Sequence, residues 1–423
     1  MTDALRNAEA TYIKEKGGVQ TERLSAVKAE LGTGTAEALC ELLSVYDDGL
    51  CAWLLGLWEP NIGGFYYSNS ARDNEGFLPD VESTAQALLL IKGSGLLSAR
   101  GNTLREALPE GIKKSIVRFV KSLQDPEDGY FYHPQWGKEI IDARRGRDYG
   151  WAISLFADLG ATPDHLTAAE HLRRGDRVNL PEHFSSPDAF KKYLINLIEE
   201  KPTSYKFGNT IASQSSEIKA AGEEYTNLLI SFLNERQNPE NGLWEDEVRI
   251  ASINGMMTLT KLYNAFGAPL PHAREALDSA IFVASSDEIP ETVCQFYNPW
   301  LTLSRVLENK LSVNDGDSHG EFLRRIRDAA PAAILNTAKR VRRFKKDDGS
   351  FSYLPDRTSP VSQNASVALP DMNEGDMNAS AVSTVGTLNS IYSALKIESV
   401  PIFSRSNSEA FLSALEGNSN ERN

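Results

Sequence analysis

Apolar residues recur along this chain at helical spacing, and the helices that they predict are of two kinds. One-sided apolar stripes occur over residues 112–123 and 225–233, where apolar side chains return every three or four positions. Segments 85–91, 151–159 and 379–395 carry small and apolar residues on more than one face. A helix that is apolar all round is buried on both sides, whereas a one-sided helix faces solvent. The pattern predicts outer and inner helices in two concentric layers, with few or no strands.

A turn motif follows several of the one-sided helices. In residues 124–131 it reads Gln-Asp-Pro-Glu-Asp-Gly-Tyr-Phe, and two further copies align with it without gaps, while a fourth is fainter. Proline cannot continue the preceding helix, the glycine takes a positive φ, and Asp or Asn bonds the local backbone. The aromatic residue two places later folds back onto the helix that has just ended. The glycines of the four copies are Gly63, Gly129, Gly242 and Gly349.

The spacing of these glycines predicts the number of repeating units. Successive intervals are 66, 113 and 107 residues, so one helical hairpin takes roughly 55–65 residues and two intervals each contain an unmarked hairpin. We place the unmarked hairpins near 187–220 and 272–307. The expected fold is an all-α (α/α)6 toroid of six helical hairpins over residues 36–397. A helical extension over 1–35 and a polar C-terminal tail over 398–423 complete the expected organisation.

The turn resembles one that known toroidal proteins share. The pattern Q-x-x-x-[DN]-G-x-[FW] between paired helices is similar to that of terpenoid cyclases, protein prenyltransferases and toroidal polysaccharide lyases, and the six-hairpin count resembles the (α/α)6 glycoside hydrolases. The resemblance implies an architecture and leaves the chemistry open. No D-x-D-D run, prenyltransferase-like zinc set or Cys-His-Gly sequence occurs. Of the six histidines, just His133 lies on the expected site face, which argues against a two-histidine sugar epimerase.

Composition and charge argue against some classes of binding partner. The net charge is −14 and no basic tract occurs, which argues against a nucleic-acid partner. No apolar stretch is long enough to span a bilayer and no signal peptide is evident, so we expect a cytoplasmic protein without a membrane partner. The three cysteines lack metal-site spacing and are expected to be buried thiols. Without a glycine-rich nucleotide motif, we expect neither a cofactor nor a metal. The oligomeric state is left open.

Candidate site residues cluster on the loops that lead into the inner helices, because every outer-to-inner connection leaves from the same end of the predicted ring. Before the first inner helix lie two acids, a tyrosine and an arginine. Before the second lie aromatic residues and a run of three arginines. Before the sixth lies another acidic cluster. The candidates are Tyr66, Arg72, Asp80, Glu82, Tyr132, His133, Trp136, Arg147, Asp148, Tyr149, Asn254, Tyr297, Glu374, Asp376 and Asn378.

Two kinds of bond cleavage are compatible with these residues. In hydrolysis, Asp80 or Glu82 would face Glu374 or Asp376 across the seam where the sixth unit meets the first, with one carboxyl protonated and the other ionised. The alternative for each acid is a helix cap or a solvated side chain. We expect the carboxyls to lie about 6.5–9.5 Å apart in an inverting enzyme and about 5–5.5 Å apart in a retaining one.

In elimination, Arg147 would neutralise a uronate carboxylate while Tyr149 or Tyr132 moved the proton. Arg147 and Tyr149 are two residues apart, so both can serve one ligand only if Arg147 still lies in the loop. The arginines could instead form a solvated loop tip, with Arg144 and Arg145 farther from the inner helix than Arg147 and Asp148.

The preferred interpretation is a carbohydrate-active enzyme, a glycoside hydrolase or a polysaccharide lyase, acting on a glycan or small-molecule substrate. A terpenoid-cyclase-like enzyme is the alternative, and a mostly aromatic cavity with few acids would favour it. A third possibility is a non-catalytic toroid that binds a protein or a glycan, in which the acids would be scattered.

Overall fold

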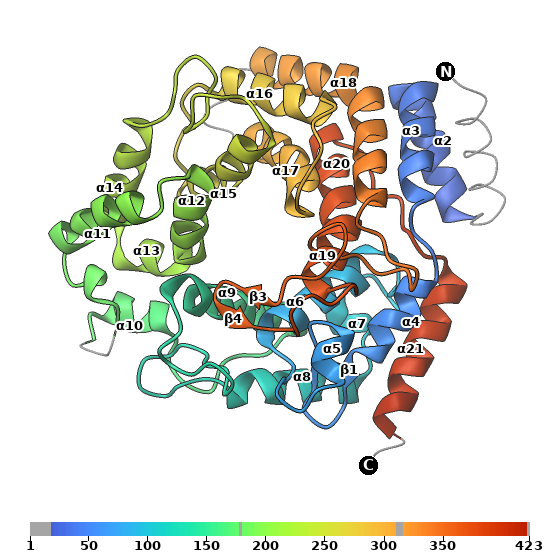
Figure 1. Ribbon diagram of the computed structural model, residues 1–423, viewed down its shortest axis with the longest axis horizontal. Helices are drawn as coiled ribbons and strands as arrows, with labels where there is room; N and C mark the ends of the chain where they lie inside the picture. The colour runs from blue at the N-terminus through green and yellow to red at the C-terminus, as the bar shows by residue number, and fades with distance from the viewer. Residues whose placement is uncertain (1–17, 177–179, 310–315, 421–423) are drawn as a thin grey trace.

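The computed structural model describes residues 18–176, 180–309 and 316–420, and it is mostly helical (Figure 1). Helices make up 62% of the structure and strands 4%, which confirms the all-α class. The described strands form two short antiparallel hairpins, β1 (Trp58–Glu59) with β2 (Gly64–Phe65) and β3 (Val361–Ser362) with β4 (Ala365–Ser366). In the described part of the chain, no helix is long and apolar enough to cross a membrane.

An inner layer of helices surrounds the centre of the molecule in Figure 1. Each inner helix contacts the next, and the last contacts the first, so the contacts form a closed cycle. In chain order the inner layer contains α6 (Val81–Gly93), α9 (Asp142–Leu159), α12 (Ser204–Ser213), α15 (Ile250–Phe266), α17 (Cys294–Glu308), α19 (Met377–Ala381), a π-helical turn (Val382–Gly386) and α20 (Thr387–Leu395).

Outer helices lie around this layer. Two helix pairs occupy the intervals where the turn motif is missing, at 187–213 and 273–308. The outer helices are α4 (Gly49–Gly56), α8 (Glu110–Ser122), α11 (Pro187–Glu200), α14 (Glu223–Asn234), α16 (Ala273–Ser285) and α18 (Gly316–Arg342). Shorter or flanking helices are α2 (Val19–Leu31), α3 (Thr33–Leu43), α5 (Asn69–Arg72), α7 (Leu104–Ala107), α10 (Ala168–Arg174), a 3-10 turn (Glu182–Phe184), α13 (Ser215–Ala221) and α21 (Arg405–Asn420).

The four repeated turns require glycine for two reasons, their backbone conformation and the lack of space for a side chain. All four have positive φ, from 70° at Gly242 to 92° at Gly63, where other residues are strained. A Cβ on any of them would also lie within 2.4 Å of the backbone of another segment. Gly63 lies against α8, Gly242 against α16, and Gly349 against Leu50 at the start of α4. The turns therefore pack against helices distant in the chain, and the last one packs against the start of α4.

Both expected ends of the repeat need correction. Residues 405–420, expected as part of a polar tail, form α21, which contacts α4 and α8. Its apolar residues Phe411, Leu412 and Leu415 share one face and are fully buried, so a short amphipathic stripe was overlooked among polar neighbours. At the other end, the boundary at residue 36 falls inside α3, which packs against α18. Of the expected extension, only α2 and the start of α3 belong to the described residues.

Candidate functional site

A cavity of about 440 Å³ lies among the inner helices and the β3 hairpin. Its wall combines aromatic rings, amide side chains and hydroxyl groups with a guanidinium and the thiol of Cys294. Apolar side chains complete the wall. The aromatic residues are Tyr67, Trp151, Tyr205, Tyr297 and Tyr353, and the polar ones are Gln86, Arg147, Asn209, Asn298, Ser359, Ser362, Gln363 and Asn378.

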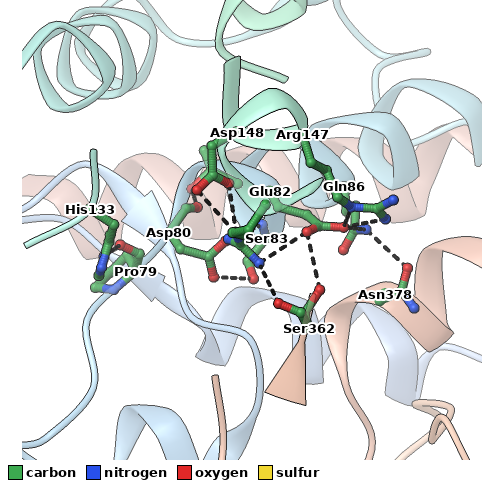
Figure 2. A network of polar contacts seen from close by, with 12 residues as sticks. Pro79, Asp80, Glu82, Ser83, Gln86, His133, Arg147, Asp148, Ser362 and Asn378 are labelled. Carbon is green, nitrogen blue, oxygen red and sulfur yellow. Dashed lines mark hydrogen bonds and ion pairs between the residues drawn. The ribbon is translucent and has the colours of Figure 1, made fainter. Parts of the chain in front are cut away.

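Behind one side of this wall lies a buried cluster of charges (Figure 2). Arg144, whose side chain is 1% exposed, joins three carboxylates. Its Nε donates to Asp148 at 3.0 Å, its Nη1 to Glu82 at 3.1 Å and its Nη2 to Asp80 at 3.0 Å. The Trp136 ring lies 4.7 Å from the guanidinium carbon, in a cation–π contact. One cation from α9 thus connects the two acids at the start of α6 with one from its own helix.

Glu82 connects this cluster to the cavity. Its carboxylate accepts from Arg147 and Arg144, from the Gln86 amide at 3.0 Å and from the Ser362 hydroxyl at 3.2 Å. Burial opposes ionisation of the group, but Arg147 and Arg144 outweigh it and lower the pKa of Glu82. Glu82 is therefore held as a carboxylate, one layer behind the wall residues Arg147, Gln86 and Ser362.

Asp80 acts as a helix cap. Its carboxylate accepts from the Ser83 backbone amide at 3.0 Å and from the Ser83 hydroxyl at 2.6 Å, which caps the first turn of α6. His133, stacked on Trp136, contacts the preceding Pro79 carbonyl at 3.0 Å through Nε2. His133 and Trp136 therefore pack behind the N-terminus of α6 and do not line the cavity.

Asp148 is the least neutralised member of the cluster. It shares Arg144 with two other carboxylates, and burial together with the charges of Asp80 and Glu82 raises its pKa to about 7. Its first oxygen, Oδ1, accepts no hydrogen bond within the described structure. Asp148 is therefore the member of the cluster that gains a proton most readily as pH falls.

Asp376 lies behind the cavity wall at the start of α19. Its carboxyl caps the helix through the Ala379 amide and accepts from the Tyr353 amide and the Thr358 hydroxyl, each at 2.8 Å. Burial raises the pKa of Asp376 to about 6 although these bonds oppose the shift. Tyr67, on the cavity wall, lies beside this segment: its carbonyl accepts from the Met377 amide at 2.8 Å, and burial together with the charge of Asp376 raises the pKa of the Tyr67 hydroxyl. Tyr67 therefore brings the cavity wall next to a buried, titratable carboxyl.

Contacts between the segments that precede α6 and α19 bring the two acidic segments together. Ser68 pairs with Asp376 through an isolated β-bridge, and the Ser70 amide donates to Glu374 at 2.9 Å. The Gln86 amide also reaches Asn378 at 3.0 Å. Glu374 lines a separate outer pocket that contains Lys346. As the described residues form it, the cavity wall includes none of the four candidate acids; Glu82 and Asp376 lie directly behind residues that belong to it.

The arginine segment is helical, so the expected loop is wrong. The α9 helix begins at Asp142, which places Arg147 and Tyr149 about 200° apart on one helix. Tyr149 lies away from the cavity, where its hydroxyl accepts from the Ala169 amide at 3.3 Å. The structure therefore does not bring Arg147 and Tyr149 to one ligand. Arg144 and Asp148 pair at i,i+4 spacing, and because such pairs favour a helix, this one helps to explain the early start of α9.

Some of the other candidate residues line or contact the cavity wall, and the rest lie away from it. Tyr297 and Asn378 line the cavity, and Asn254 accepts from the wall residue Asn298 at 2.9 Å. The remaining three lie elsewhere: Tyr132 bonds Asp128, Arg72 pairs with the exposed Asp73, and Tyr66 is buried in the core.

Sequence reasoning missed two central residues. The sequence favours Arg147 over Arg144 as a site residue, because Arg144 stands farther from the expected helix. The i,i+4 spacing of Arg144 and Asp148 is a signal that could have identified Arg144. Tyr67 was passed over for its neighbour Tyr66, and no local signal separates them, because the partner Asp376 is distant in the chain.

A second buried carboxyl, Glu217 on α13, lies away from the cavity beside Arg145 and Tyr130. It is 1% exposed, and burial raises its pKa to about 8 despite nearby cations. A raised folded pKa gives stability that is complete below the unfolded pKa of about 4.3 and is lost as pH rises through about 8.

Replacement of Glu217 by Gln should remove this pH dependence. We expect Glu217→Gln to raise the Tm relative to the unmodified chain at about pH 8.5 more than at about pH 5.5, measured by circular dichroism. Glu224→Gln, at an exposed position of α14, is the control and should show no such trend. Equal Tm differences at both pH values would contradict the assignment.

Within the described ranges, no group of three or more His, Cys, Asp or Glu residues could hold a metal ion. The candidate site therefore consists of the cavity wall and the two carboxyls that lie behind it, Glu82 and Asp376. Comparisons of the chain with protein-family models, with curated proteins and with solved structures find no match.

Proposed function

We propose that the protein is a six-hairpin (α/α)6 toroid and a carbohydrate-active enzyme that cleaves a glycosidic bond in its central cavity. The outer–inner pairs would be α4 with α6, α8 with α9, α11 with α12, α14 with α15, α16 with α17 and α18 with α19–α20. The closed cycle of contacts among the inner helices and the packing of Gly349 against α4 support this architecture.

The composition of the cavity wall is the observation that carries the function. Five aromatic rings offer faces for sugar rings, and five amides with two serine hydroxyls offer donors and acceptors for sugar hydroxyls. An apolar substrate would leave these amides without partners, at a cost for each group. A polyhydroxylated sugar ring can stack on the aromatic side chains and also form hydrogen bonds with the amides and hydroxyls.

The two carboxyls behind the wall have pKa values that are shifted in opposite directions. The pKa of Asp376 is raised to about 6, while that of Glu82 is lowered. Such a separation is what glycoside hydrolysis requires, since one group must supply a proton and the other must stay charged. In our proposal Tyr67 gives its hydroxyl proton to the glycosidic oxygen and takes the proton of Asp376, while the sugar C–O bond breaks. Ionised Glu82 stabilises the positive charge that develops on the sugar. A water molecule then adds to the sugar carbon, and the proton that it releases returns to Asp376, so that both carboxyls regain their starting states.

A terpenoid-cyclase-like enzyme is the second candidate. The aromatic wall and the position of the acids behind it favour that reaction class, because a carbocation is stabilised by ring faces. The five amides and Arg147 count against it, since an apolar chain would bury them without hydrogen bonds. A non-catalytic glycan-binding toroid would bind sugars without turnover.

Tyr67→Phe tests the proposed proton transfer. Loss of a general acid lowers kcat by about 10²–10⁴-fold, so we expect a loss of at least about 100-fold with binding retained. In the unmodified enzyme kcat should fall as pH rises through about 6, because Asp376 must carry the proton, and this dependence should disappear in Tyr67→Phe. Substrates come from a glycan screen that records new reducing ends and absorbance near 235 nm, which appears only on elimination.

The control for this variant is Tyr149→Phe, which removes a buried hydroxyl outside the cavity and should leave kcat near normal. Full activity in Tyr67→Phe would refute the role of Tyr67. A product with the ultraviolet absorbance of an unsaturated sugar would show that the reaction is elimination and not hydrolysis. Binding without turnover would show that the protein binds glycans without cleaving them.

A further inference from the structure

We infer that the cavity selects an uncharged polyhydroxylated ligand over the matching sugar acid. This inference rests on the proposed function and names the substrate class of the same site. It depends on the charge balance around Arg147, the guanidinium of the cavity wall.

Arg147 is the single cationic side chain among the described residues that line the cavity. Its side chain is 28% exposed, so it reaches the cavity surface. Both its Nε and its Nη2 are directed at one oxygen of Glu82, which lies immediately behind it. A carboxylate ligand would therefore have to share this guanidinium with a carboxylate that is already bound.

The cluster behind Arg147 adds further negative charge. Arg144 and Arg147 supply two positive charges, while Asp80, Glu82 and Asp148 supply up to three negative ones within a continuous set of ion pairs. Four of these side chains are no more than 4% exposed, so solvent screens them weakly. A bound anion would add a further negative charge to a cluster whose three carboxyls already share two cations.

Two uncharged amide side chains of the wall are held in place by contacts within the protein. The Gln86 amide nitrogen donates to Glu82 and to Asn378, each at 3.0 Å. Because the carboxylate can only accept, this contact fixes which way the Gln86 amide points. The Asn298 amide donates to the Asn254 side-chain oxygen at 2.9 Å, which holds it in place. Preset neutral amides cost little reorganisation when a sugar binds.

The test compares matched pairs of sugars by calorimetry and by intrinsic tryptophan fluorescence. The probes are cellobiose with cellobiouronic acid, glucose with glucuronate, and galactose with galacturonate. For the pair that binds best, we expect the neutral member to bind at least about tenfold more tightly, with a Kd that is nearly unchanged between about 50 and 500 mM NaCl.

Glu82→Gln provides the decisive variant, because it leaves Arg147 without its bound carboxylate. We expect the preference for the neutral sugar to shift at least about tenfold toward the sugar acid. Glu374→Gln removes a carboxylate at the same seam but outside the cavity, and should leave the preference unchanged. Circular dichroism of both variants checks that they are folded, and the salt dependence of the unmodified chain tests the inference without any variant.

The outcomes separate the two proposals. Tighter binding of the sugar acids by the unmodified chain, or an unchanged preference in folded Glu82→Gln, would overturn the inference and leave the proposed function standing. Failure of every sugar to bind would overturn the proposed function and the inference with it.

Discussion

Arg144→Met should lower the free energy of unfolding by about 3–5 kcal/mol, the usual cost when one partner is removed from a buried ion pair. Arg144 is the only cation that contacts Asp80 and Asp148 among the ion pairs described, and both carboxylates are almost fully buried. Methionine fills a similar volume, so the loss reports the uncompensated charges more than a cavity. Urea unfolding followed by circular dichroism measures the change.

The pH dependence of this loss distinguishes charge from packing. If carboxylates without a partner cause it, the deficit should shrink as pH falls, because protonation removes the buried charges. Arg145→Met is the matched control on the same helix. Arg145 pairs with Asp142, and its side chain is 16% exposed, so its loss should cost less. A deficit below about 1 kcal/mol for Arg144→Met, in the range of exposed ion pairs, would show that the cluster does not depend on this residue.

Gly349→Ala should destabilise the fold by about 2–5 kcal/mol. The glycine has φ of 84°, and a left-handed conformation costs other residues about 1–2 kcal/mol. Its added Cβ would also lie 2.4 Å from the Leu50 nitrogen and 2.8 Å from the Gly49 carbonyl carbon, and such overpacking costs about 1–3 kcal/mol more. Because these contacts join the last repeated turn to α4, the substitution loosens the contact between the end and the beginning of the repeat.

Gly111→Ala is the control for this substitution. Gly111 lies in α8, and a Cβ there would meet no atom within 4 Å. Alanine should stabilise that helix by up to about 1 kcal/mol. Guanidinium unfolding of both variants gives the comparison. Equal midpoints for Gly349→Ala and the unmodified chain would mean that the turn can shift away from α4 without cost.

The sequence by itself determined the local features of this protein. Helix type and turn chemistry follow from neighbouring residues, since periodicity and glycine conformation act over a few positions. The stripes at 112–123 and 225–233 became α8 and α14, and Gly129 and Gly242 took the positive φ that their motif predicts. The same reasoning missed α21, whose apolar face is narrow, and the early start of α9.

The tertiary structure alone decided which side chains meet. Arg144 contacts Asp80 and Glu82, which precede it by 64 and 62 residues, and Tyr67 lies beside the segment of Asp376, where its carbonyl accepts from the Met377 amide. Such pairs depend on how the first and last units come together, and no short-range pattern encodes that distance. Burial inside the resulting cluster then separates the pKa values of Glu82 and Asp376, because desolvation exists only once the helices have packed.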